Sequence, residues 1–481
     1  MRFKDLELIA VSLIVFFLYA FADDWLPSAA LLTLWLCVKL VSTGDRLYSL
    51  PMALTFQWSQ VTIGVFYLGL TGRAVPAVDE SDYRPMVMIG LGCCLALAAG
   101  IKLGLKARKR PDPRVPRPEY AFSFAPLVMV YIASIFIEGS LITIAPFYPT
   151  FRQIIVTLDT ARLGILFLIL RRLCGGPRPQ WGLFGIVVSV EVVLGITGFF
   201  AGFREPVVLA VLAVLEIFDH RNTRHWMAVG VAIVGVSLLG LVWMGIRSDY
   251  RREYVEVDQF SGSRNARVTR VGDLTSNFLK NDPTNIWRTA DALVDRMWTI
   301  YYPALAIARV PSVLPHTDGS IIGAALLHIV TPRVFFPDKP GLESDSEEVR
   351  KYANVRVAGR EANTSIAFGY SAEAYIDFGL PLMFLPVLGF GFFIGAMYAV
   401  FRSIIWHREL FVAFGTVAFW LSTYLFERSW GTMLGTAVGF MGYLGPPVVL
   451  IDRFLMVRVS ADKEREDAPV LFDAPIYRDR V

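Results

Sequence analysis

Long apolar runs separated by short polar connections dominate the chain. An apolar helix of about 20 residues crosses the ~30 Å hydrocarbon core of a bilayer while satisfying its own backbone hydrogen bonds. About twelve runs reach or approach this length. They lie near residues 5–22, 25–41, 52–71, 86–104, 123–144, 156–171, 182–203, 206–219, 227–245, 381–402, 410–427 and 430–451. The pattern predicts an all-α, multi-pass integral membrane protein.

The composition supports this class of protein. Of 481 residues, 55% are hydrophobic and 18% are charged, and the mean hydropathy is +0.51, outside the range of soluble domains. The net charge of +4 gives no indication of nucleic-acid binding. Cys37, Cys93 and Cys94 lie in apolar runs and Cys174 in a connection, so a disulfide framework is not predicted.

The distribution of charge among the connections predicts the orientation. If the amino terminus is cytoplasmic, the even-numbered connections are cytoplasmic too, and basic residues gather there, as the positive-inside rule requires. These residues include Lys106, Arg171, Arg172, Arg221, Arg224 and Arg402. The opposite connections begin with acidic residues at 23–24 and 79–82. Both termini are therefore predicted to be cytoplasmic. The small residues at 20–22 leave a cleavable leader as an alternative to a retained first span.

One long interruption divides the apolar pattern. We expect an amino-terminal bundle of about nine helices over 1–245, a large outer loop over 246–380, further spans over 381–452 and a cytoplasmic tail over 453–481. Aromatic residues such as Trp287 and Trp298 argue against disorder in the loop. Residues 285–310 and 318–330 have helix-compatible patterns, whereas the acidic stretch 342–363 is predicted to be solvated and mobile.

Residues 331–341, TPRVFFPDKPG, stand out within this loop. Pro332 and Pro337 restrict the backbone on either side of Arg333. A guanidinium group binds phosphate oxygens in a bidentate manner and Lys339 adds a point charge, so the stretch is suited to an anionic ligand. The alternative is a proline-rich interface loop that contacts a lipid headgroup.

A second cationic candidate is Arg204, in the stretch GFREP at residues 202–206 between two apolar runs. A charge within the bilayer is costly, so Arg204 is expected at the outer rim or in a wet cavity. The alternative is an interfacial arginine beside Glu205. Glu191 and Glu216 lie inside apolar runs and are expected to face the interior of the bundle.

Two carboxylates precede the tenth apolar run, in the stretch YSAEAYIDFG. Glu373 and Asp377 are four residues apart and share one helical face if the tenth span extends backwards. Such carboxylates can accept a proton from a sugar hydroxyl, and they can equally pair with Arg333 or Arg360 as part of the structure. The residues themselves leave both alternatives open.

Several catalytic motifs are absent from the sequence. There is no GxxxxGK[ST] loop, no HExxH motif or Cys/His cluster, and no GxSxG elbow. His316 and His328 are twelve residues apart, which gives little support for zinc. Neither a metal nor a cofactor is predicted. Matched broken helices in two inverted halves, typical of transporters, are also not evident.

The architecture and three stretches, 204–206, 332–340 and 373–379, resemble the Wzy-type polysaccharide polymerases. The resemblance implies a GT-C-like membrane glycosyltransferase of the bacterial inner membrane. Such an enzyme joins polyprenyl-diphosphate-linked oligosaccharide repeat units into O-antigen, capsule or exopolysaccharide at the periplasmic face, without a metal. An O-antigen ligase that uses the same donor, and a transporter or flippase, are the alternatives.

Roles for the candidate residues follow from this chemistry. The leaving diphosphate needs cations, for which we expect Arg204, Arg333, Lys339 and Arg360. The attacking hydroxyl needs a base, for which Glu373 is the first choice, Asp377 the second and His328 the third. Phe335, Tyr375 and Tyr301 offer apolar faces to sugar or lipid. The expected partners are the lipid-linked oligosaccharides, membrane lipids, and a flippase and chain-length regulator of the same pathway.

Overall fold

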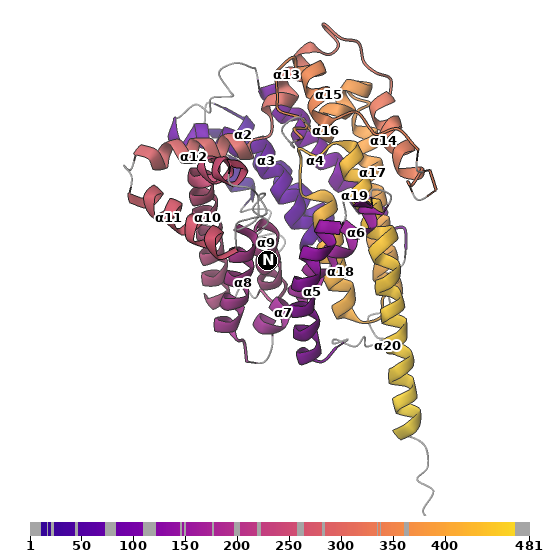
Figure 1. The fold of residues 1–481 in the computed structure, drawn as a ribbon. Helices are drawn as coiled ribbons and strands as arrows, with labels where there is room; N and C mark the ends of the chain where they lie inside the picture. Colours follow the sequence, from indigo (N-terminus) through magenta and orange to yellow (C-terminus); the bar gives the residue numbers. More distant parts are fainter. Residues whose placement is uncertain are drawn as a thin grey trace, which may run out of the picture.

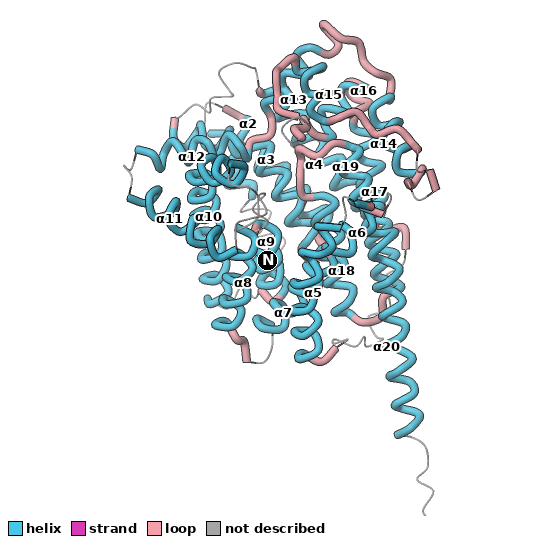
Figure 2. Tube along the Cα trace, viewed as in Figure 1, coloured by secondary structure: helices cyan, strands magenta, loops and turns pink. Residues whose placement is uncertain are grey.

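The computed structural model is helical throughout its regular structure (Figure 1, Figure 2). It describes residues 11–16, 18–20, 24–43, 47–72, 83–108, 122–144, 147–148, 151–175, 178–196, 203–218, 223–256, 264–280, 284–333, 335–336, 338–359 and 365–466. No strand occurs among these residues. The predicted all-α class is confirmed.

The helices follow one another with short connections. The first half of the chain forms α2 (Leu26–Val41), α3 (Ser49–Thr71), α4 (Arg84–Gly104), α5 (Phe124–Ile144), α6 (Arg152–Asp159), α7 (Ala161–Gly175), α8 (Trp181–Ile196), α9 (Arg204–Glu216) and α10 (Thr223–Glu256). The second half forms α11 (Arg264–Lys280), α12 (Thr284–Met297), α13 (Tyr301–Arg309), α14 (Ser320–Val330), α15 (Asp345–Ala353), α16 (Tyr370–Phe378), α17 (Phe384–Ile404), α18 (Arg408–Thr423), α19 (Trp430–Gly439), the π-helical turn η4 (Phe440–Leu444) and α20 (Gly445–Glu466).

Five helical stretches among the described residues are long and apolar enough to cross a membrane. They are Arg84–Gly104, Gln153–Gly175, His225–Tyr250, Phe384–Ile404 and Trp430–Met456. Shorter apolar helices cover Val11–Ala20, Leu26–Val41, Phe124–Ile137, Trp181–Gly195 and Ser320–Val330. This composition is compatible with a membrane protein. The predicted loop at 246 and the predicted tail at 453 both begin as helix, because α10 continues to Glu256 and α20 to Glu466.

Helices α4 and α17 pack with their backbones in direct contact. Each carries two glycines four residues apart, Gly100 and Gly104 on α4 and Gly391 and Gly395 on α17. A Cβ atom added at Gly100 would lie 2.1 Å from the carbonyl oxygen of Leu388, which is closer than real atoms approach. Small residues in this spacing allow close helix crossings in membranes. Because α2 and α3 also pack on α4, this crossing joins the carboxy-terminal helices to the amino-terminal bundle.

Helices α13 to α16 and their connections form a cap at one end of the molecule (Figure 1). The cap has a hydrophobic core of its own, made of Ala306, Val310, Val349, Tyr352, Ala353, Val357, Phe368, Ala372 and Ile376. The prediction of a solvated segment over 342–363 was therefore wrong for α15. A capping box between Ser344 and Glu347 begins this helix, and its apolar residues are buried at helical spacing.

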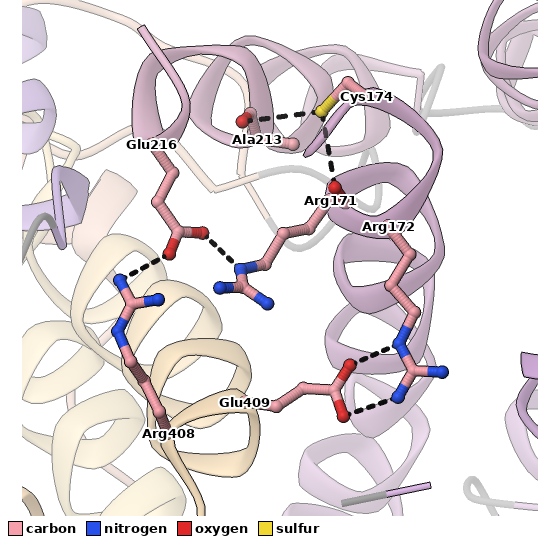
Figure 3. Close-up of polar contacts among 7 residues, drawn as sticks. All are labelled: Arg171, Arg172, Cys174, Ala213, Glu216, Arg408 and Glu409. Carbon is pink, nitrogen blue, oxygen red and sulfur yellow. Dashed lines mark hydrogen bonds and ion pairs between the residues drawn. The ribbon is translucent and has the colours of Figure 1, made fainter. Parts of the chain in front are cut away.

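A buried polar network joins α7, α9 and α18 at the end opposite the cap (Figure 1, Figure 3). Glu216 accepts hydrogen bonds from Arg171 at 2.7 Å and from Arg408 at 2.9 Å. Arg172 binds both carboxylate oxygens of Glu409, at 2.5 and 2.6 Å. Glu216 faces the interior, as predicted. Arg171 and Arg172, which the sequence assigned to a connection, instead lie in α7 and form these ion pairs.

The glycine crossing can be tested by adding one methyl group. In Gly391→Ala the new Cβ would lie 2.4 Å from the carbonyl oxygen of Leu97, so α4 and α17 must separate. We expect a loss of about 1–3 kcal/mol of stability, measured as a lower Tm of the detergent-solubilised protein. Gly389→Ala, on the same helix but facing open space, is the control. Equal Tm values for the two variants would contradict a tight crossing.

Candidate active site

Three arginines converge where α9, α12 and the connection between α18 and α19 meet. Arg204 is the first residue of α9. Its Nη2 donates to Tyr424 Oη at 2.8 Å and to Glu205 Oε1 at 3.0 Å. The guanidinium group also lies 5.2 Å from the centre of the Tyr424 ring. The Arg204 side chain is nevertheless 47% exposed, so a ligand can reach it.

The other two arginines come from distant parts of the chain. Arg296, in the last turn of α12, donates from Nη1 and Nη2 to the two oxygens of Glu427, at 2.9 and 3.2 Å. Arg428 donates to the carbonyl oxygen of Leu421, and its guanidinium group lies 5.0 Å from the centre of the Tyr424 ring. We name Arg204, Arg296 and Arg428 the arginine cluster.

Nearby charges and burial shift the pKa values of the arginine cluster. Glu427 raises the pKa of Arg296, burial lowers the pKa of Arg428, and the nearby charge of Arg204 acts to lower both. Arg204 is thus within electrostatic reach of both Arg296 and Arg428. Three carboxyl groups, those of Glu205, Glu427 and Asp295, interact with Arg204 or Arg296, so arginines and carboxyl groups are equal in number. Guanidinium forks in such a setting are suited to phosphate oxygens.

A second basic cluster lies at the carboxyl end of α14. Lys339 Nζ donates to the carbonyl oxygen of His328 at 2.5 Å. Burial lowers the pKa of His328, and Lys339 and Arg333 act in the same direction, so this imidazole is neutral near pH 7. The Arg333 side chain has no hydrogen bond or ion pair among the described residues. Phe335, close by in the sequence, is 77% exposed.

The structure therefore divides the predicted cations between two places. Arg333 and Lys339 share one cluster with His328, whereas Arg204 lies with Arg296 and Arg428, which the sequence reasoning missed. Arg360 lies outside the described residues. A signal for Arg428 existed, because Glu427-Arg428 and Arg204-Glu205 are similar acid–base pairs in short connections between apolar runs.

Asp377 binds the amino-terminal end of a helix. Its two oxygens accept from the backbone N–H groups of Ile321, at 3.1 Å, and Ile322, at 2.9 Å, in the first turn of α14. Thr317 Oγ1 also donates to this carboxylate. A carboxylate satisfies otherwise unpaired N–H groups and interacts favourably with the helix dipole at this position. This geometry fits the structural alternative, with backbone amides rather than an arginine as partners.

Glu373 occupies an equivalent place at a second helix. Its Oε2 accepts from the backbone N–H of Trp430, the first residue of α19, at 2.8 Å. Glu373 is 1% exposed, and its Oε1 has no hydrogen-bond partner among the described residues. Burial raises the pKa of Glu373 well above its usual range, and Glu348 adds to the rise. Glu373 and Asp377 thus share one face of α16, and each contacts a different helix. The tenth span does not extend backwards as the prediction supposed, because α16 ends at Phe378 and α17 begins at Phe384.

The predicted aromatic residues are spread over the cap. The rings of Tyr301 and Tyr302 are 5.1 Å apart, and Tyr302 lies close enough to Arg296 to raise its pKa. Tyr301 therefore packs on a residue that lies near the arginine cluster. Tyr375 packs edge-on against His316, with ring centres 5.8 Å apart, inside the cap. No group of three or more potential metal ligands occurs in the part of the chain that the structure describes.

Comparison with known families gives one match. A family model described as a domain of unknown function (DUF8712) matches residues 178–400. The matched segment contains Arg204, Arg296 and both carboxylates of α16, whereas Tyr424 and Arg428 lie beyond it. No curated protein and no solved structure matches the chain.

The carboxyl groups of the cap predict a pH dependence of stability. Burial, with Asp345 and Glu343 nearby, raises the pKa of Glu348 to about 8. A carboxyl with a raised pKa stabilises the fold at low pH, and this contribution is lost as pH rises from the unfolded value through about 8. We expect the Tm to fall between pH 5 and about 9, and Glu348→Gln to flatten the decline. Exposed Asp338→Asn should keep the wild-type slope. A wild-type slope in Glu348→Gln would contradict this assignment.

The bonds of Asp377 predict a structural effect of its removal. Asp377→Ala leaves buried N–H groups of α14 without an acceptor, which costs about 1–3 kcal/mol. Asp377→Asn retains an acceptor and should recover most of the Tm. An unchanged Tm in Asp377→Ala would show that the hydrogen bonds from Asp377 to the first turn of α14 are not needed for stability. It would favour a purely catalytic role for this carboxylate.

Proposed function

We propose that the chain is a GT-C-like membrane glycosyltransferase with about twelve spans, which joins polyprenyl-diphosphate-linked repeat units into a surface polysaccharide. It acts at the periplasmic face of a bacterial inner membrane, with both termini cytoplasmic. The observation that carries the proposal is the arginine cluster, where three guanidinium groups gather beside the cap and two of them, Arg204 and Arg296, are about half exposed.

The arginine cluster supports the departure of a diphosphate. In this reaction the bond between the anomeric carbon and the diphosphate oxygen breaks, and a hydroxyl oxygen of a second repeat unit takes its place. Negative charge develops on the leaving oxygen. Cations held in place before the reaction stabilise that charge without further reorganisation. Arg204 and Arg296 are suited to contact the diphosphate because their side chains are 47% and 54% exposed.

The proton of the attacking hydroxyl needs an acceptor. His328 is neutral and only half-buried, so it is chemically able to accept a proton. Glu373 is buried with a raised pKa, and both oxygens of Asp377 bind α14. The three remain predictions for the base, and His328, which neighbours Lys339 and Arg333, lies outside the arginine cluster.

The experiment compares surface glycan from the native host after gene deletion and complementation. Arg296→Ala should reduce polymer about 10²–10³-fold, leaving single repeat units, and Arg296→Lys should recover little of it. Arg356→Ala, an exposed arginine of the cap, is the matched control and should restore full polymer. Glycan size and lipid attachment are measured at equal protein abundance.

A second variant separates phosphate binding from a structural ion pair. Arg296→Ala/Glu427→Ala removes both partners, so a purely structural role predicts rescue and phosphate binding predicts continued loss. Normal polymer in Arg204→Ala and Arg296→Ala would exclude the arginine cluster as the site. Full-length polymer on its carrier after gene deletion would indicate a ligase instead. Arg333→Ala in the same assay tests whether Arg333 and Lys339 also hold the diphosphate, which stays a prediction.

A further inference from the structure

Helix α14 is apolar on all sides although it belongs to the cap. Ser320 and His328 are its only polar residues. On one side Ile322 and Ala325 are buried in the main core. On the other side Leu326, Leu327 and Val330 are exposed, with Leu327 64% exposed. A helix that is apolar all round is typical of a buried or membrane environment, so the uncovered side of α14 needs a partner.

The position of α14 indicates what covers it. The helix packs along α19, which begins the apolar stretch Trp430–Met456 that is long enough to cross a membrane (Figure 1). The exposed side of α14 therefore lies level with one end of a span. Its 11 residues extend about 16 Å, too short to cross the ~30 Å core. A helix of this length beside a span contacts one leaflet only.

The residues that follow α14 combine aromatic and cationic side chains. Phe335 and Phe336 are both exposed. Lys339 is tied to α14 through the carbonyl oxygen of His328. Arg333 and Lys339 outnumber the single acidic residue of this stretch, Asp338. Aromatic rings with adjacent cations are typical of the membrane–water interface, where the cations meet lipid phosphates.

We infer that α14, together with Arg333, Phe335, Phe336 and Lys339, forms an interfacial foot that rests in the leaflet on the cap side. Its apolar side chains lie among acyl chains, and Arg333 and Lys339 bind the phosphates of anionic phospholipids. Because Asp377 joins α14 to α16, the foot fixes the height of the cap above the bilayer. The inference is independent of the proposed reaction.

The test measures depth in the membrane. Nitroxide labels are placed at Leu327→Cys and Phe335→Cys, and the four native cysteines are buried. The protein is reconstituted in nanodiscs of phosphatidylcholine with phosphatidylglycerol. Accessibility to oxygen is compared with accessibility to a water-soluble nickel chelate. Leu385→Cys, on the exposed side of α17, is the membrane reference, and Arg356→Cys is the water reference.

We expect the ratio of oxygen accessibility to nickel-chelate accessibility at 327 and 335 to be similar to that at 385. This ratio should be severalfold higher than the ratio at 356. If the labels at 327 and 335 are as accessible to water as the label at 356, the interfacial foot is overturned. Strong spin–spin broadening would also overturn it, because it would show that a second copy of the chain, and not lipid, covers α14. Arg333→Gln/Lys339→Gln should move the label at 335 toward water in anionic nanodiscs and not in pure phosphatidylcholine. An equal shift in the two kinds of nanodisc, or no shift in the anionic nanodiscs, would overturn the role of Arg333 and Lys339. Transferase activity enters neither readout.

Discussion

A charge inside an apolar helical bundle must find a partner, and this requirement organises the molecule from end to end. An unpaired buried charge costs several kcal/mol. Three buried carboxylates of the apolar helices accordingly meet arginines across helix boundaries. The pairs are Glu191 with Arg162, Glu216 with Arg171 and Arg408, and Glu409 with Arg172. Each pair fixes the register of the helices that it joins, as the glycine crossing does for α4 and α17.

The same requirement acts on helix ends in the cap. The first N–H groups of a helix lack partners within it. At α19 this end is buried at Trp430, and at α14 Ile321 is half-buried and Ile322 is buried. Glu373 and Asp377 lie one turn apart on α16 and supply acceptors to both helices. Short α16 therefore holds α14 and α19 together. A carboxylate whose oxygens accept these backbone hydrogen bonds has a structural role. Oε1 of Glu373, near Glu348, has no hydrogen-bond partner among the described residues.

The sequence predicted what depends on local pattern. Apolar runs located the helices, and the cost of buried charge predicted that Glu216 faces inward. Features that depend on contacts between residues far apart in the chain could not be predicted from the sequence. The paired glycines at 100, 104, 391 and 395 become informative only once α4 and α17 are known to meet. Arg296 joins Arg204 across 92 positions, and no spacing rule connects them. The capping box of α15, by contrast, was present in the sequence at Ser344 and Glu347.

The two basic clusters differ in whether their arginine side chains are held by partners. Arg204 and Arg296 are held by carboxylates and Tyr424, so their guanidinium groups are fixed before a ligand arrives, which suits the stabilisation of developing charge. Arg333 has no such support among the described residues and follows an apolar helix with exposed phenylalanines nearby. A cation that is not held by a side-chain partner can bind many similar phosphate groups, such as those at a membrane surface. Preorganisation therefore favours the arginine cluster for chemistry and the end of α14 for the lipid surface.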